Sequence, residues 1–136
     1  MIRGLIGTGL AGLGLVGGAA AIKYSDNGSA TVKVKDHGVT RTVHLPAGNG
    51  QLYSCPADIN SKLKPVDISS ARIKLTLKDL RAQENQLDAQ YPQHYVPRPI
   101  LDEFNRLADR DDALVAAENQ TIDQHNQILK DNCKLG

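Results

Sequence analysis

The sequence predicts an α+β protein that is mainly α, and three observations support this fold class. Residues 4–22 are uncharged and rich in apolar side chains and glycine, residues 31–55 contain alternating apolar and polar side chains, and residues 66–133 carry apolar side chains at heptad spacing. In chain order, these patterns predict an N-terminal transmembrane or signal helix, a small β-hairpin or three-stranded element, and a long antiparallel helical hairpin.

The N-terminal run has the basic start, apolar centre and small-residue exit of a signal peptide. Arg3 precedes the run and Ala19–Ala21 close it, which predicts cleavage after Ala21. We favour an uncleaved signal anchor at residues 1–23, because nineteen uncharged residues would span about 28 Å as a helix. Small residues that allow close packing between membrane helices recur in this segment, namely Gly7, Ala11, Gly14 and Gly18.

A polar tether at residues 24–30 is expected to separate this segment from one small domain at residues 31–136. Basic residues do not orient the span, because Arg3 lies on one side of it and Lys23 on the other. The cysteine content favours an extracytoplasmic C-terminal domain on a single-pass protein of the cytoplasmic membrane, which contacts the lipid bilayer through residues 4–22. Cleavage would make the domain a secreted one.

The composition predicts a thin hydrophobic core. The chain has 136 residues with one Phe, four Tyr and no Trp, so Leu, Ile and Val must supply most of the core. Small exported domains with thin cores often carry disulfides. Cys55 and Cys133 predict one intramolecular bridge, worth roughly 4 kcal/mol in the chain-entropy treatment. Free buried thiols and an intermolecular bridge are the alternatives.

Two strands and a turn are predicted in the first part of the domain. Alternating side chains predict strands at Thr31–Lys35 and Thr40–Leu45, and Asp36-His37-Gly38 predicts a tight turn in which Gly38 takes a positive φ. A two-stranded sheet is marginal in water, so a third strand or a helix is expected to cover its apolar face, and Gln51–Cys55 is the candidate for a third strand.

Two helices complete the domain. The first is expected at about Asp67–Gln90, with Asp67 as its N-cap after Pro65. The second is expected at about Pro99–Asn132, because proline fits the first helical turn. Heptad positions on the first helix form a coiled-coil seam that consists of Ile73, Leu77, Leu80 and Leu87.

Charge favours antiparallel packing of the two helices. Residues 62–81 contain six basic and two acidic residues, whereas residues 109–130 contain five acidic and two basic ones. Pairs such as Arg72 with Glu118 are then possible, and exposed pairs of this kind set register more than stability. The second helix also carries a polar column between two apolar columns, and the sequence leaves the role of this column open: Asp111, Glu118 and His125.

No catalytic or cofactor motif is present in the sequence. It lacks G-x-G-x-x-G, a P-loop, H-E-x-x-H and C-x-x-C, so we expect no cofactor and no metal site. A net charge of +1 gives no argument for nucleic acid. An enzyme that uses His125, Glu118 and Cys55 is the least favoured reading, because a bridged cysteine cannot be a nucleophile.

The connection between the helices is the candidate partner-binding surface. It combines prolines with side chains that are enriched in binding hot spots, and the candidates are Tyr91, His94, Tyr95 and Arg98. The sequence therefore indicates a non-catalytic, membrane-anchored interaction module that binds protein partners or itself, for example an accessory subunit of a cell-envelope or membrane complex. The alternatives are a cleaved, secreted binding protein and a phage-encoded envelope, lysis or exclusion accessory protein.

Overall fold

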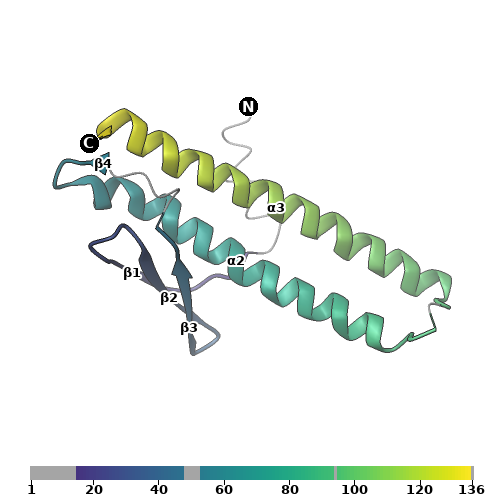
Figure 1. The fold of residues 1–136 in the computed structure, drawn as a ribbon. Helices are drawn as coiled ribbons and strands as arrows, with labels where there is room; N and C mark the ends of the chain where they lie inside the picture. The colour runs from purple at the N-terminus through teal and green to yellow at the C-terminus, as the bar shows by residue number, and fades with distance from the viewer. Residues whose placement is uncertain (1–14, 48–52, 94, 136) are drawn as a thin grey trace.

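The computed structural model describes residues 15–47, 53–93 and 95–135. Two long helices, α2 (Ile59–Ala89) and α3 (Arg98–Asn132), form an antiparallel hairpin, and a three-stranded antiparallel sheet packs against α2 (Figure 1). This arrangement confirms the mainly helical α+β fold and the helical hairpin. Among the described residues, no helix is both long and apolar enough to cross a membrane.

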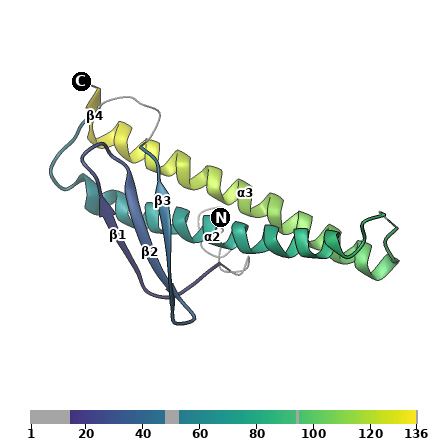
Figure 2. The ribbon, with the colours of Figure 1, turned by 60° about the horizontal axis from the view of Figure 1, so that its bottom comes forward.

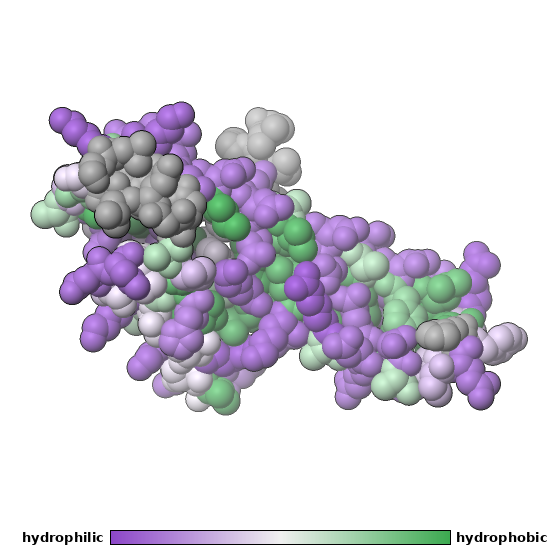
Figure 3. All heavy atoms as spheres, in the orientation of Figure 1, coloured by the Kyte–Doolittle hydropathy of each residue, from purple (hydrophilic) through white to green (hydrophobic). Residues whose placement is uncertain are grey.

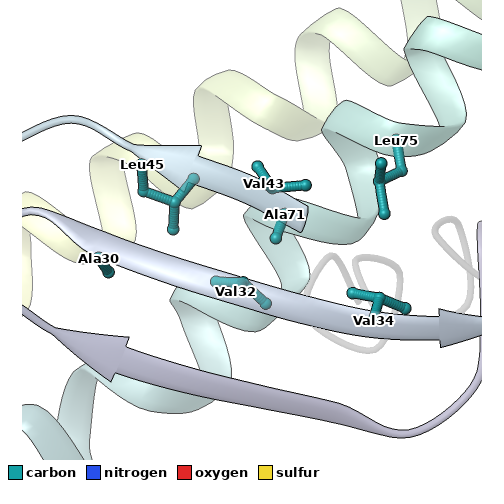
Figure 4. Packing of buried hydrophobic residues seen from close by; sticks show 7 residues of the cluster. All are labelled: Ala30, Val32, Val34, Val43, Leu45, Ala71 and Leu75. Atoms are coloured by element: carbon teal, nitrogen blue, oxygen red, sulfur yellow. The ribbon is translucent and has the colours of Figure 1, made fainter. Parts of the chain in front are cut away.

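The sheet consists of β1 (Ala20–Tyr24), β2 (Ala30–Asp36) and β3 (Val39–Leu45), in that spatial order. Its inner face meets α2 in a cluster of buried apolar side chains (Figure 4): Ala30, Val32, Val34, Val43, Leu45, Ala71 and Leu75. The alternation predicted for Thr31–Lys35 and Thr40–Leu45 is confirmed in β2 and β3, because alternate side chains of these strands point into this cluster.

The predicted turn between β2 and β3 is also confirmed. His37 and Gly38 have φ angles of 52° and 80°, which belong to a two-residue turn of the kind that matches the twist of the strands. Behind the turn, the guanidinium of Arg41 donates hydrogen bonds to both carboxylate oxygens of Asp79 on α2, each at 2.8 Å. This hydrogen-bonded pair lowers the pKa of Asp79 and ties the sheet to the helix.

The third strand is not Gln51–Cys55, so that prediction is wrong. The sheet instead uses β1, whose Ala20, Ile22 and Tyr24 pack against the core. The short strand β4 (Tyr53–Ser54) pairs instead with β5 (Lys134–Leu135), next to the start of α2 and the end of α3.

The tether predicted at residues 24–30 is likewise corrected. Tyr24 ends β1, and the next residues form a closed turn in which the Ser25 N–H donates to the Ser29 carbonyl at 2.8 Å. β2 then begins at Ala30. The segment is a hairpin loop because strand pairing on both sides holds its two ends together.

The end of the N-terminal apolar run belongs to the folded domain. Residues 15–19 are not helical and lie against α2, where the Val16 N–H donates to Thr76 Oγ1 and the Arg72 guanidinium donates to the Gly18 carbonyl, both at 2.7 Å. Gly18 has a φ of 101°, and a Cβ there would lie 1.8 Å from the Lys35 carbonyl oxygen. The structure therefore gives Gly18 a role in a close backbone crossing rather than on a helix. Gly7, Ala11 and Gly14 lie outside the described residues.

The positions at which the two long helices begin can be explained from the residues around them. α2 begins at Ile59, so the prediction that Asp67 is its N-cap is wrong. Pro65 lies in the second turn, where it costs one backbone hydrogen bond, and the burial of Leu63 and Asp67 on either side holds that turn in place. α3 begins at Arg98 with Pro99 in its first turn, which confirms the prediction for the second helix.

Two glycine variants test whether the end of the apolar run is docked. We expect Gly18→Ala to lower the free energy of unfolding by about 2 kcal/mol or more, because it introduces both a strained φ and a backbone clash. Gly17→Ala is the matched control, since a Cβ at that position meets no atom within 4 Å. Chemical denaturation measures both variants. Equal stabilities would mean that this segment is not part of the folded domain.

Candidate functional site

The polar column of α3 faces a matching column on α2. Three pairs cross the helix interface, and each successive pair lies seven residues further along both helices in opposite directions: Arg81 with Asp111 at 3.0 Å, Lys74 with Glu118 at 2.7 Å, and Asp67 with His125 at 2.6 Å. We call these three pairs the polar ladder. The polar column of α3 therefore has a structural role, because each of its three side chains is paired with a polar side chain of α2. The antiparallel charge complementarity predicted from the sequence is confirmed, although Glu118 pairs with Lys74 and not with Arg72.

Apolar layers fill the seam around the ladder. Six buried side chains from the two helices form the second core of the domain: Ile73, Leu77, Leu80, Leu107, Leu114 and Ala117. The three α2 residues in this cluster are among those predicted for the coiled-coil seam. The fourth predicted residue, Leu87, is half-buried and packs at the distal edge of the same cluster.

Asp67 is the most buried member of the ladder, with a side chain that is 6% exposed. One carboxylate oxygen accepts a hydrogen bond from the Tyr24 hydroxyl at 2.6 Å, and the other lies 2.6 Å from His125 Nδ1. Burial and this hydrogen bond raise the pKa of Tyr24, so its hydroxyl keeps its proton and remains a donor. One carboxylate thus joins β1, α2 and α3.

A pocket of about 330 Å³ lies beside this carboxylate. Leu45, Pro46 and Ile122 form its apolar side, while Ser70 and Asn126 contribute polar atoms. Ile122 is 47% exposed, which is high for a large apolar residue. In the view of Figure 3, hydrophobic residues appear along the line where the two helices meet, bordered by hydrophilic ones.

The charged groups around this pocket are paired with one another. Lys74 is held by Glu118, and His125 is held by Asp67 through Nδ1. The constellation of His125, Glu118 and Cys55 is not assembled, because Glu118 bonds elsewhere and Cys55 is in a disulfide. Among the residues that the structure covers, no group of three or more His, Cys, Asp or Glu side chains could hold a metal ion. The pocket network therefore stabilises the junction of three elements.

The predicted disulfide is confirmed between Cys55 and Cys133, which are 78 residues apart in sequence. It lies where β4 and β5 pair, next to the start of α2 and the end of α3. The bridge therefore closes the open end of the helical hairpin.

The connection between α2 and α3, which carries the described partner-binding candidates, lies at the opposite end, where the hairpin extends beyond the sheet (Figure 2). Tyr95 is 85% exposed, and the Arg98 side chain is also 85% exposed, with Asp102 3.7 Å away. Tyr91 is half-buried at the end of α2, and His94 lies outside the described residues. Of the three candidates that the structure describes, Tyr95 and Arg98 are thus the two that the fold leaves open to solvent. We call this end of the hairpin the tip.

Sequence reasoning missed Tyr24 and Asp67 as members of the polar network. A signal for Asp67 was present, since it lies seven residues before Lys74 and fourteen before Arg81, on the same face of the helix. Comparison of the chain with protein-family models, curated proteins and solved structures gives no match.

Removal of the buried carboxylate tests the network. We expect Asp67→Ala to lower the free energy of unfolding by about 2–4 kcal/mol, because it leaves the Tyr24 hydroxyl and the His125 ring without their partner. Asp88→Ala, at an exposed position of the same helix, should cost less than about 0.5 kcal/mol. Thermal or chemical unfolding compares the two variants. Similar values would contradict a network that holds three elements together.

Glu84 on α2 and Asp111 on α3 are neighbouring carboxyl groups whose shifted pKa values predict that the stability of the protein depends on pH. Burial, reinforced by Asp111, raises the pKa of Glu84 above its ordinary value of 4.5, so the stabilising contribution of Glu84 is complete below pH 4.5 and is lost as the pH rises through the raised pKa. We expect Glu84→Gln to match the native protein in acid and to melt higher at neutral pH.

Asp111→Asn should behave in the opposite way. The hydrogen bond from Arg81 lowers the pKa of Asp111, so its contribution is present above its ordinary value of 3.8 and is lost as the pH falls. The asparagine variant should therefore melt lower at neutral pH. Melting curves across the acid range measure both variants, and shifts of the same sign at neutral pH would refute the assignment.

Proposed function

We propose that this protein is a non-catalytic, extracytoplasmic interaction module that binds a protein partner through the tip of its helical hairpin. The observation that carries the proposal is the exposure of Tyr95 and Arg98 at the end of a hairpin that extends past the sheet. Tyrosine and arginine are enriched in binding hot spots. The module would serve as an accessory subunit of a cell-envelope or membrane complex.

The rest of the hairpin supports this role because it fixes the tip. The polar ladder and its apolar layers hold α2 against α3, and the disulfide closes the opposite end. Pro92, Pro97 and Pro99 restrict the backbone around Tyr95, which lowers the entropy lost when the connection is ordered in a complex. A preorganised tip binds with less conformational cost than a flexible loop.

Export is supported by the disulfide and by the apolar run. Disulfides persist in oxidising compartments, and the run offers the apolar centre that export signals carry. The docked state of residues 15–24 and a continuous span over residues 4–22 exclude each other. An anchored form would therefore release β1 from the sheet, and cleavage after Ala21 would remove the first two residues of β1.

Crosslinking at the tip tests the proposed function. A photoreactive amino acid at position 95 should capture one protein in the native cell, whereas the same group at position 39 should not. Val39 is a suitable control because it is 62% exposed and lies at the β2–β3 turn, away from the tip.

Affinity measurements with the captured partner complete the test. We expect the double variant Tyr95→Ser with Arg98→Ser to weaken the complex at least about tenfold without changing the melting temperature. Unchanged affinity, or capture of the same protein from position 39, would rule out the tip as the binding surface.

A further inference from the structure

The outer face of the sheet carries a cluster of positive charge. Strand alternation turns the side chains that do not pack on α2 toward solvent, in three rows across the strands: Lys23, Thr31 and His44; Ala21, Lys33 and Thr42; Lys35 and Thr40. All of these are exposed except Thr31, which is half-buried beside His44. We call this surface the lysine face.

The charge of the lysine face is not used by the fold. Within the described part of the chain, none of its three lysines forms an ion pair, whereas Arg41, Lys74 and Arg81 are each bonded to a carboxylate. No carboxylate occurs among the eight described residues of the face. The nearest along the strands is Asp36, at the end of β2, and it is engaged by Arg41 and His37.

Edge protection does not explain these lysines. Lysine on an edge strand prevents pairing with other chains, and Lys23 on β1 fits that role. Lys33 and Lys35, however, lie on β2, the central strand, whose backbone is already paired on both sides. Two unpaired cations at the centre of a sheet, flanked by threonine hydroxyls, form a surface that complements an anionic partner.

We propose that the lysine face binds the surface of an anionic lipid bilayer, with its lysines against the lipid phosphates; this rests on the proposed placement at a membrane. The strand register puts Lys33 about 8 Å from Lys23 and about 7 Å from Lys35, roughly one Debye length in each case, so neighbouring lysines act together on a charged surface. The face also contains no large apolar side chain among its described residues, as suits adsorption rather than insertion.

The geometry keeps the two proposed surfaces apart. The helices lie behind the sheet, on the face opposite the lysines, and the tip extends beyond the sheet (Figures 1 and 2). A bilayer on the lysine face therefore leaves Tyr95 and Arg98 open to a protein partner. The domain would bind both surfaces at once.

Vesicle flotation of the full chain tests this proposal. The probes are phosphatidylcholine vesicles with and without phosphatidylglycerol, and the variant is Lys23→Gln with Lys33→Gln and Lys35→Gln. Each lysine near an anionic surface contributes about a fivefold gain in partitioning, so the triple variant should lose roughly a hundredfold. The matched control removes the same charge from exposed helix positions, with Lys62→Gln, Lys64→Gln and Lys130→Gln, and should lose less than about fivefold.

The outcomes separate the possibilities. Selective loss in the lysine-face variant, with its melting temperature unchanged, supports the proposal. Equal loss in both triple variants, or equal binding to vesicles without phosphatidylglycerol, would overturn it. Tighter binding to soluble RNA than to anionic vesicles, with the same lysine dependence, would also overturn it in favour of a polyanion. Crosslinking from position 95 is measured on the same variant, so a failure at the membrane surface is distinguished from a failure of the tip.

Discussion

The polar ladder between α2 and α3 is the constraint on which the arrangement of this protein depends. Apolar heptads alone would allow the helices to slip by seven residues. A slip in one direction places Asp67 against Glu118, two carboxylates, and a slip in the other places Lys74 against His125. The observed register pairs every member with a complementary group. Polar groups within a helix interface commonly specify register in this way, with the apolar layers supplying most of the stability.

The same register organises the rest of the chain. It brings the end of α3 beside the start of α2, where Cys55 and Cys133 are close enough to bond. It also buries Asp67 where Tyr24 of β1 can reach it, so the first strand is held by a helix–helix contact as well as by its neighbour in the sheet. The disulfide and the surroundings of Asp67 both depend on how far one helix is shifted along the other.

Much of this arrangement was predictable from local patterns. Strict alternation marks β2 and β3, heptad spacing marks the helices, and opposite charge on the two helices indicates their antiparallel packing. The tip was predictable from composition, and Tyr95 and Arg98 are in fact exposed. The disulfide was predictable from the presence of two cysteines in a small domain whose composition gives only a thin hydrophobic core.

Other features depend on contacts between distant residues. β1 was missed because glycine-rich apolar sequence resembles an export signal, and only the pairing of Ile22 with Val32 reveals a strand. The start of α2 was missed because Pro65 reads as a boundary, whereas packing outweighs one lost hydrogen bond. Asp67 binds groups 43 and 58 residues away, a separation that no local pattern encodes.

The placement of the disulfide determines how a mechanical force is transmitted through the molecule. A force applied between the sheet and the residues after Cys133 is carried by the sulfur–sulfur bond and bypasses the helical hairpin. A partner that pulls on the tip instead loads both helices along their axes, and this force reaches the sheet through α2.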